Sequence, residues 1–222
     1  MPERSRIVGV DEAGRGSFLG PLVVGGFAVE PGLVDALRTA GARDSKELTP
    51  AIRELVYDRL HRLGEMRSIA IPPAEIDRAV AHQQLNELEA TAFGHLVRGL
   101  RASEARVDAC DPDERRFGRR VAHHAGIPVR VIARHHADRD DPVVGAASIV
   151  AKVRRDRAIA RLASQLGVEI GSGYPSDPET VDFVRGWLAT HAAHPPWLRG
   201  SWATMKRVKL ARPARTLDQF GP

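Results

Sequence analysis

Four acidic residues stand beside apolar stretches of the sequence, and their type and spacing suit them to shared chemistry. Asp11 and Glu12 follow a short β-branched run, and Asp108 lies near the end of a second apolar run. Asp138 comes just before a helix start that is rich in alanine. Carboxylates at strand ends in an α/β sheet converge on one edge, where ligands usually bind. We therefore expect these four side chains to meet in one site.

Converging carboxylates repel one another unless cations lie between them, and Mg²⁺ and Mn²⁺ are hard cations that prefer oxygen ligands. Beside basic residues, such a cluster suits two-metal phosphoryl transfer, in which the metals activate a water and stabilise the leaving oxygen. A plainer interpretation stays open, because most acidic residues at strand ends form turns or are solvated. Composition does not separate four other aspartates from this set: Asp111, Asp113, Asp140 and Asp141.

The elements that must position these carboxylates alternate along the chain. Expected strands cover residues 6–10, 22–29, 66–71, 105–109 and 128–133. Expected helices cover residues 32–40, 50–63, 74–80, 85–101, 112–125, 143–166 and 178–190. The first two strands are close enough to form a hairpin, so the sheet begins antiparallel, and later strands alternate with helices. The pattern predicts an α/β domain with a mixed sheet over residues 1–166, a helical extension over 167–208 and a flexible tail over 209–222.

Composition limits the class of protein. The chain has 222 residues, with 33 basic and 28 acidic side chains and a net charge of +5, which permits a polyanionic partner without requiring one. The single cysteine, Cys110, excludes an internal disulfide framework and a zinc site built from several thiolates. There is no run of about 20 apolar residues and no signal-peptide pattern at the start. We expect a cytoplasmic monomer with no membrane span.

Five short blocks carry a specific resemblance to a known family. They are Val10–Gly16 with Gly20-Pro21, Asp44-Ser45-Lys46, Val107-Asp108, Ala137-Asp138 with the helix start that follows it through Asp156, and Gly171–Pro175. In this order they resemble ribonuclease HII, the type 2 ribonuclease H, over about residues 6 to 208. The residues of the later blocks are more similar to those of the archaeal and eukaryotic branch of the family than to those of the usual bacterial branch.

The resemblance implies a ribonuclease H-like layered fold, with a mixed central sheet flanked by helices and a C-terminal helical extension. It implies a metal-dependent endonuclease that cuts the RNA strand of RNA–DNA hybrids and incises at ribonucleotides embedded in DNA, with a place in DNA replication and repair. The products would carry 3′-hydroxyl and 5′-phosphate ends. Asp11, Glu12, Asp108 and Asp138 would be the catalytic metal ligands, binding Mg²⁺ or Mn²⁺, with two ions during catalysis.

The resemblance also implies which residues bind substrate. They are Gly14, Arg15, Gly16, Asp44, Ser45, Lys46, Ser148, Lys152 and Tyr174. Glycines let a backbone approach a sugar-phosphate closely, and the family uses this segment with the tyrosine to sense a ribose. Ser148 and Lys152 lie four residues apart on one helical face. Several basic residues either line a duplex groove or form a solvated face: Arg154, Arg155, Arg157, Arg161, Lys206 and Arg207.

The sequence departs from the family in two places. Ser17-Phe18-Leu19 follows Gly16 where the family usually has a proline, so the turn is expected to be looser. Residues 216–220 resemble the sliding-clamp-binding tail of archaeal members, with Ala214 in place of the usual leading glutamine. For this tail we favour a disordered terminus with no partner, and clamp binding is the alternative hypothesis.

The main functional alternative is a non-catalytic RNA–DNA hybrid-binding module on the same fold. Intact carboxylates argue against it, because negative charge does not help a protein to bind a polyanion without metal.

Overall fold

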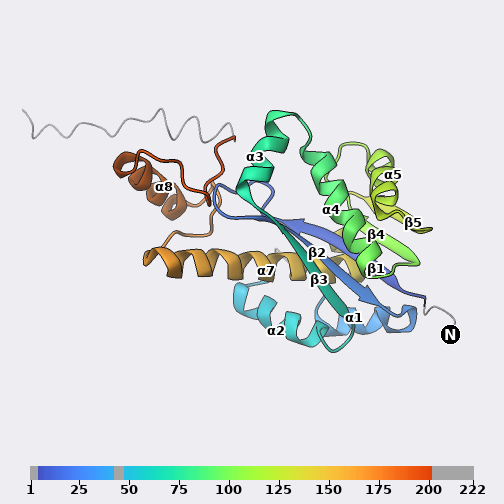
Figure 1. Cartoon of the computed structure of the whole chain (residues 1–222). Helices are drawn as coiled ribbons and strands as arrows, with labels where there is room; N and C mark the ends of the chain where they lie inside the picture. The colour runs from blue at the N-terminus through green and yellow to red at the C-terminus, as the bar shows by residue number, and fades with distance from the viewer. Residues whose placement is uncertain (1–4, 43–47, 202–222) are drawn as a thin grey trace, which may run out of the picture.

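A five-stranded mixed sheet forms the centre of the computed structural model, which describes residues 5–42 and 48–201 (Figure 1). The strands are β1 (Ile7–Ala13), β2 (Leu22–Val29), β3 (Glu65–Ile71), β4 (Glu104–Asp108) and β5 (Arg130–Arg134), in the spatial order β3-β2-β1-β4-β5. The strand pairs β1–β2 and β2–β3 are antiparallel, whereas β1–β4 and β4–β5 are parallel. The predicted mixed sheet with an antiparallel start is confirmed.

Helices cover both faces of this sheet. The helical elements are the 3₁₀ turn η1 (Pro31–Leu33) and the α-helices α1 (Val34–Ala40), α2 (Pro50–Leu60), α3 (Pro73–Ala81), α4 (Leu85–Gly99), α5 (Glu114–Ala125), α6 (Ala137–Asp140), α7 (Pro142–Leu166) and α8 (Pro178–Thr190). Figure 1 shows α4 and α5 on one face, and α7 with α1 and α2 on the other. Each face buries its own apolar cluster, so two hydrophobic layers stabilise the sheet.

The C-terminal part of the described chain packs around the loop that follows β1. Phe18 and Leu19 of this loop are buried with Ile159 of α7 and Val184 of α8 in a third apolar cluster. Leu19 also pairs with Leu198 in an isolated β-bridge. The loop after β1 therefore joins the sheet to the helical extension.

Sequence signals explain where the long helices begin and end. Asp141 accepts a hydrogen bond from Val143 N at the start of α7, which ends at Gly167 with a φ of 67°. Asp177 caps α8 by accepting from Glu179 N. A side-chain cap satisfies backbone N–H groups that have no partner within the helix, and a glycine adopts the left-handed end without strain. These signals are why the predicted bounds of residues 143–166 and 178–190 agree with the structure.

Two differences from the predicted elements lie at the acidic residues, apart from small shifts such as the helix expected over 50–63, which ends at Leu60. The first strand does not end at residue 10, because Asp11, Glu12 and Ala13 continue to pair with β2 across from Gly25, Val24 and Val23. The pairing strand β2 overrides the local turn preference of acidic residues. The short helix α6 was not expected at all, and it carries Asp138.

Helix α7 approaches the sheet closely because glycines lie beneath it. A Cβ atom added at Gly25 of β2 would stand 2.5 Å from both Ala147 O and Ala151 N of α7. Neither backbone atom is able to move away without shifting the helix. We therefore expect Gly25→Ala to lower the free energy of unfolding by about 1–3 kcal/mol, measured by urea denaturation.

Gly186→Ala in the exposed middle of α8 is the matched control. A Cβ atom there has open space within 4 Å, so the change should leave stability unchanged or raise it by up to about 1 kcal/mol. Equal effects of the two substitutions would contradict the close packing of α7 on β2.

Candidate active site

Three carboxylates from three separate elements meet at one end of the central strands. Asp11 lies on β1, Asp108 at the end of β4 and Asp138 on α6, and each offers an oxygen within 4.8 Å of the others. Asp11 is 5% exposed and Asp138 is 2% exposed. The parallel register, which pairs Val10 with Val107, places the two strand aspartates side by side. The structure therefore brings together three of the four acidic residues singled out in the sequence.

A hydrogen bond and a sharp turn of the backbone hold α6 beside this cluster. Asp108 Oδ1 accepts a hydrogen bond from Ala137 N at 3.3 Å, which ties the residue before Asp138 to the end of β4. His136, just before the helix, has a φ of 57°, a left-handed conformation that turns the chain sharply. The turn and the hydrogen bond together carry Asp138 back over the two strand aspartates.

Burial and mutual repulsion dominate the electrostatics of the cluster. The pKa of Asp11 is raised to about 7, chiefly by burial and then by the charges of Asp108 and Asp138, while a hydrogen bond from Ser148 acts in the opposite direction. Burial and the charge of Asp138 also raise the pKa of Asp108. A divalent cation between the three groups removes this repulsion. The all-oxygen donor set is the one that Mg²⁺ and Mn²⁺ prefer, so the residues present fit such an ion.

Glu12 lies beside this cluster rather than in it. Successive side chains on a strand point to opposite faces, and Glu12 is not one of the three residues whose oxygens meet. Its pKa is raised well above the ordinary value by burial first and then by Asp11 and Glu89. Its assignment as a metal ligand therefore stays a prediction.

The glycine-rich segment after β1 is anchored through the side chain of Arg15. Arg15 Nε donates to both carboxylate oxygens of Glu89, at 2.9 and 3.1 Å, and Nη2 donates to Asn86 Oδ1 at 2.7 Å. Glu89 is completely buried on α4 and also accepts a hydrogen bond from the thiol of Cys110. Glu89 was not singled out from the sequence, although it lies four residues after Leu85 and three before Ala92, on an apolar face of the helix that is an unusual place for a carboxylate.

A buried arginine supports the tyrosine segment. The guanidinium carbon of Arg155 lies 4.2 Å from the centroid of the Tyr174 ring, and Nη2 donates to Ser172 O at 3.0 Å. Both sequence-based readings of Arg155, a groove contact or a solvated residue, are wrong, because it is only 2% exposed. A Cβ atom added at Gly14 would stand 2.4 Å from Arg155 Nε. One guanidinium therefore contacts both segments that the family resemblance connects with the ribose.

The other sequence-predicted substrate residues fall into three groups. Ser148 is completely buried and hydrogen-bonds Asp11, a position that favours ordering of the carboxylate over direct contact with a substrate. Lys152 is half-buried one turn further along α7. Asp44, Ser45 and Lys46 lie outside the described residues, as do Lys206, Arg207 and the tail at 216–220.

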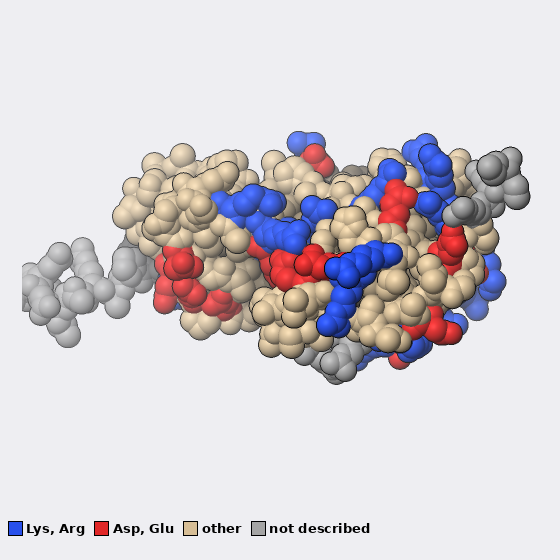
Figure 2. Space-filling view, turned by 90° about the horizontal axis from the view of Figure 1, so that it is seen from below, with Lys and Arg blue, Asp and Glu red and all other residues tan. Residues whose placement is uncertain are grey.

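The arginines of α7 do not form a continuous basic stripe in the described part of the chain. Arg157 pairs with Glu54, and Asp156 of the same helix pairs with Arg53 at 3.0 Å. The guanidinium of Arg154 lies over the ring of Tyr57. Figure 2, in which the molecule of Figure 1 is seen from below, shows basic and acidic side chains next to one another. This face is therefore of mixed charge.

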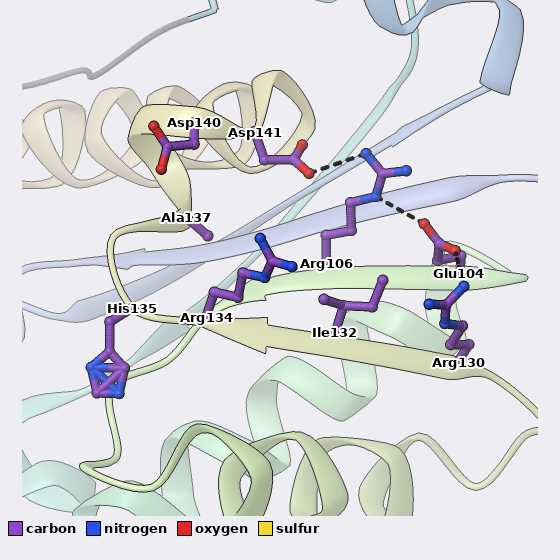
Figure 3. Close-up of a pocket in the computed structure, with 9 residues that line it drawn as sticks. All are labelled: Glu104, Arg106, Arg130, Ile132, Arg134, His135, Ala137, Asp140 and Asp141. Carbon is purple, nitrogen blue, oxygen red and sulfur yellow. Dashed lines mark hydrogen bonds and ion pairs between the residues drawn. The ribbon is translucent and has the colours of Figure 1, made fainter.

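A hollow of about 400 Å³ lies on the sheet face beyond the cluster (Figure 3). None of the three clustered aspartates lines it. In Figure 3, Glu104 and Asp141 both point toward Arg106, which bonds them at 2.9 and 3.1 Å. Asp141 also caps α7, so this hollow contains a brace for the α6–α7 junction rather than the candidate chemistry.

Comparisons with family models and with curated proteins point to the same family. The family model described as Ribonuclease HII matches residues 8–205. The Ribonuclease HII of Cenarchaeum symbiosum is 43% identical over 216 residues, covering 97% of this chain and 99% of the relative. That of Methanoregula boonei is 41% identical over 214 residues, covering 96% of this chain and 99% of the relative. These matches confirm the resemblance stated from the motifs, including its closeness to archaeal members.

Solved structures agree with the fold. The ribonuclease H2 from Pyrococcus horikoshii OT3 superposes with a TM-score of 0.84 at 38% identity, covering 92% of this chain and 97% of that chain. The RNase HII in the PCNA:RNase HII complex from Archaeoglobus fulgidus gives a TM-score of 0.84 at 35% identity, covering 96% of this chain and 100% of that chain.

Among the described residues, none of the helices combines the length and the apolar character that a membrane span needs.

The raised pKa of Asp11 leads to a testable dependence of stability on pH. Between pH 3.8 and about 7 the folded, metal-free chain keeps a proton on Asp11 that the unfolded chain has released. The stability contributed by this group is therefore fully present below pH 3.8 and is lost as the pH rises through about 7. In chelator, Asp11→Asn should become more stable than the wild type as the pH rises through this window, by about 1 kcal/mol or more.

Chemical denaturation at a series of pH values measures this difference. The exposed Asp35 of α1 provides the control, and Asp35→Asn is measured over the same pH range as the background for losing one acidic side chain. A difference between Asp11→Asn and the wild type that does not change with pH would contradict the electrostatics described for the cluster.

Proposed function

The chain belongs to the ribonuclease HII family of metal-dependent ribonucleases that act on RNA–DNA hybrids, and we propose that it also incises duplex DNA at embedded ribonucleotides. Cleavage leaves 3′-hydroxyl and 5′-phosphate ends in this proposal. The observation that carries it is the meeting of Asp11, Asp108 and Asp138 at one end of the sheet. A module that only binds hybrids gains nothing from this cluster, because buried like charges cost stability and repel a phosphodiester.

The metal ligands in the proposal are Asp11, Glu12, Asp108 and Asp138, of which Glu12 lies beside the other three. Mg²⁺ or Mn²⁺ is the ion, with two ions during catalysis. Bound divalent cations supply activation of the water nucleophile and neutralisation of charge on the scissile phosphate. The chain's own contribution is to hold its carboxylates at a fixed spacing, with the Ser148 hydrogen bond favouring the ionised form of Asp11.

Recognition of the ribose is assigned to Gly14, Arg15, Gly16 and Tyr174. Support comes from their shared anchoring, since Phe18 N donates to the carbonyl oxygen of the residue before Tyr174 at 2.7 Å. The glycine segment and the tyrosine segment are thus held at a fixed distance, as a site that detects one 2′-hydroxyl requires. Further substrate contacts are proposed for Asp44, Ser45, Lys46 and Lys152, and Ser148 takes part in substrate binding through its hydrogen bond to Asp11.

The remaining parts of the proposal concern organisation and partners. Residues 1–166 form the catalytic domain, and residues 167–208 complete the groove for the nucleic acid. Residues 216–220 bind a sliding clamp, which is consistent with the relative from Archaeoglobus fulgidus being solved with PCNA. The protein acts as a cytoplasmic monomer.

A duplex DNA carrying one embedded ribonucleotide tests the central proposal. We expect cleavage in Mg²⁺ or Mn²⁺ and none in chelator. Asp11→Asn should lower turnover by about a thousandfold or more, equivalent to about 4 kcal/mol of transition-state stabilisation. Its dissociation constant for the duplex should stay within about threefold of the wild-type value, because the carboxylate contributes little to binding a polyanion.

Asp35→Asn is again the matched control and should cleave at the wild-type rate. Full turnover by Asp11→Asn, or undiminished cleavage in chelator, would reject the metal-dependent mechanism. Cleavage of long hybrids without cleavage at the single ribonucleotide would reject the finer substrate assignment alone.

The clamp proposal has its own test. A peptide of residues 214–222 titrated into a sliding clamp should release measurable heat in a calorimeter, because residues 217 and 220 offer one aliphatic and one aromatic anchor. A peptide with alanine at both of these positions should give none. Absence of heat with the unmodified peptide would remove the clamp from the proposal.

A further inference from the structure

Arg199, near the end of the described chain, is completely buried. All four hydrogen bonds that the structure shows for its guanidinium go to backbone carbonyls. Its Nε and Nη2 atoms both donate to Gly20 O at 3.0 Å. Its Nη1 atom donates to Gly14 O at 2.7 Å and to Arg15 O at 3.1 Å. One side chain from the C-terminal extension therefore spans both ends of the loop that follows β1.

This placement is expensive for the fold. None of the ion pairs formed by the described residues includes Arg199. Burial, with a smaller repulsion from Arg155, lowers the pKa of Arg199 to about 10, so the guanidinium still carries its charge at neutral pH. Burying a charge costs stability, and the more distant charges of Asp77 and Glu89 offset only part of that cost, because the net shift of the pKa is downward. What the guanidinium supplies in return is its four hydrogen bonds to backbone carbonyls of the loop after β1.

The hydrogen bonds of Arg199 fix which way two peptide groups face. In a trans peptide the C=O and the following N–H point in opposite directions. The carbonyls of Gly14 and Arg15 face inward to Arg199, and that of Gly14 also accepts from Ser17 N and Ser17 Oγ. The N–H groups of Arg15 and Gly16 consequently face outward. Gly16 is exposed, and a Cβ atom added there would meet nothing within 4 Å among the described residues, so the loop is accessible to a ligand at this residue.

Two adjacent outward N–H groups form a concavity that suits an anion. We propose that Arg199 is a positioning residue for substrate recognition, which orients the Gly14–Gly16 backbone so that its N–H groups bind a phosphodiester oxygen of the substrate strand. The inference rests on the proposed function, because the anion is taken to be part of the nucleic acid. Arg15 contributes through its backbone here, since its side chain is bound separately by Glu89 and Asn86.

Asp77 provides a second attachment of the same segment, so the effect of orienting the glycine loop can be distinguished from the effect of merely holding the extension in place. Asp77 of α3 accepts hydrogen bonds from Gly200 N at 2.8 Å and from Ser201 N at 3.1 Å. Asp77 thus holds the residues next to Arg199 without any hydrogen bond to the glycine loop. We expect Asp77→Ala to loosen the segment without removing any of the four hydrogen bonds of Arg199, which makes it the matched control.

Arg199→Lys is the test variant, because it keeps the positive charge and loses the planar fork of donors. Cleavage of the single-ribonucleotide duplex gives KM and kcat, fluorescence anisotropy in chelator gives the duplex Kd, and calorimetry gives the Mn²⁺ affinity. We expect KM and Kd to rise by about tenfold. We expect kcat to stay within about threefold and the Mn²⁺ affinity to stay within about twofold, because the carboxylates do not contact Arg199.

Asp77→Ala should lower the unfolding temperature and leave KM within about twofold of the wild type. Unchanged KM and Kd in Arg199→Lys would overturn the proposal, and so would an equal rise of both in Asp77→Ala. A wild-type protein that binds duplex but fails to cleave it would reject the proposed function, while the comparison of Kd values would still test the role of Arg199.

A measurement on the wild-type protein covers the case in which Arg199→Lys does not fold. In ¹⁵N-labelled protein with chelator, uncleaved duplex should shift the amide resonances of Arg15 and Gly16. The buried Arg199 side-chain N–H should exchange slowly with solvent. Unmoved amides, or a rapidly exchanging Arg199 side chain, would contradict the proposal.

Discussion

Repulsion between three carboxylates is the constraint on which the rest of this structure depends. Asp11, Asp108 and Asp138 lie within 4.8 Å of one another at their oxygens, in surroundings that raise the pKa of the first two. A free chain would separate them. They stay together because two parallel strands in register, a left-handed turn and a short helix leave them no other position. Divalent cations then turn this unfavourable arrangement into a binding site.

Much of the packing around the site keeps that arrangement rigid. Helix α7 approaches the sheet so closely that a Cβ atom added at Gly25 would stand only 2.5 Å from the helix backbone, and Asp141 caps its first turn. Arg106 connects Asp141 to β4, so the start of α7 and the strand that carries Asp108 move as one unit. Buried arginines perform a similar task on the substrate side: Arg199 bonds the carbonyl of Gly14 in the loop after β1, 185 residues away in the sequence, and Arg155 bonds the carbonyl of Ser172 beside Tyr174.

The sequence predicted the elements well and the exact position of the acidic residues less well. Helix α8 agrees at both ends because Asp177 is a local capping signal. The extension of β1 through Ala13 depends on pairing with β2, and α6 depends on Asp108, so neither has a local signal. Arg155 was misjudged because arginine is mostly exposed in proteins, whereas Tyr174 and two backbone segments enclose it here. Motif resemblance supplied the active-site residues, which residue types alone left ambiguous.

Location of the metal ion tests the central claim most directly. Crystals of the protein soaked in Mn²⁺ give an anomalous difference map in which the ion is visible independently of any assumed ligand. The account predicts a peak at coordination distance, about 2–2.6 Å, from carboxylate oxygens of Asp11, Asp108 and Asp138 together. Anomalous density that lies elsewhere, or three aspartates with no ion between them at saturating Mn²⁺, would contradict it.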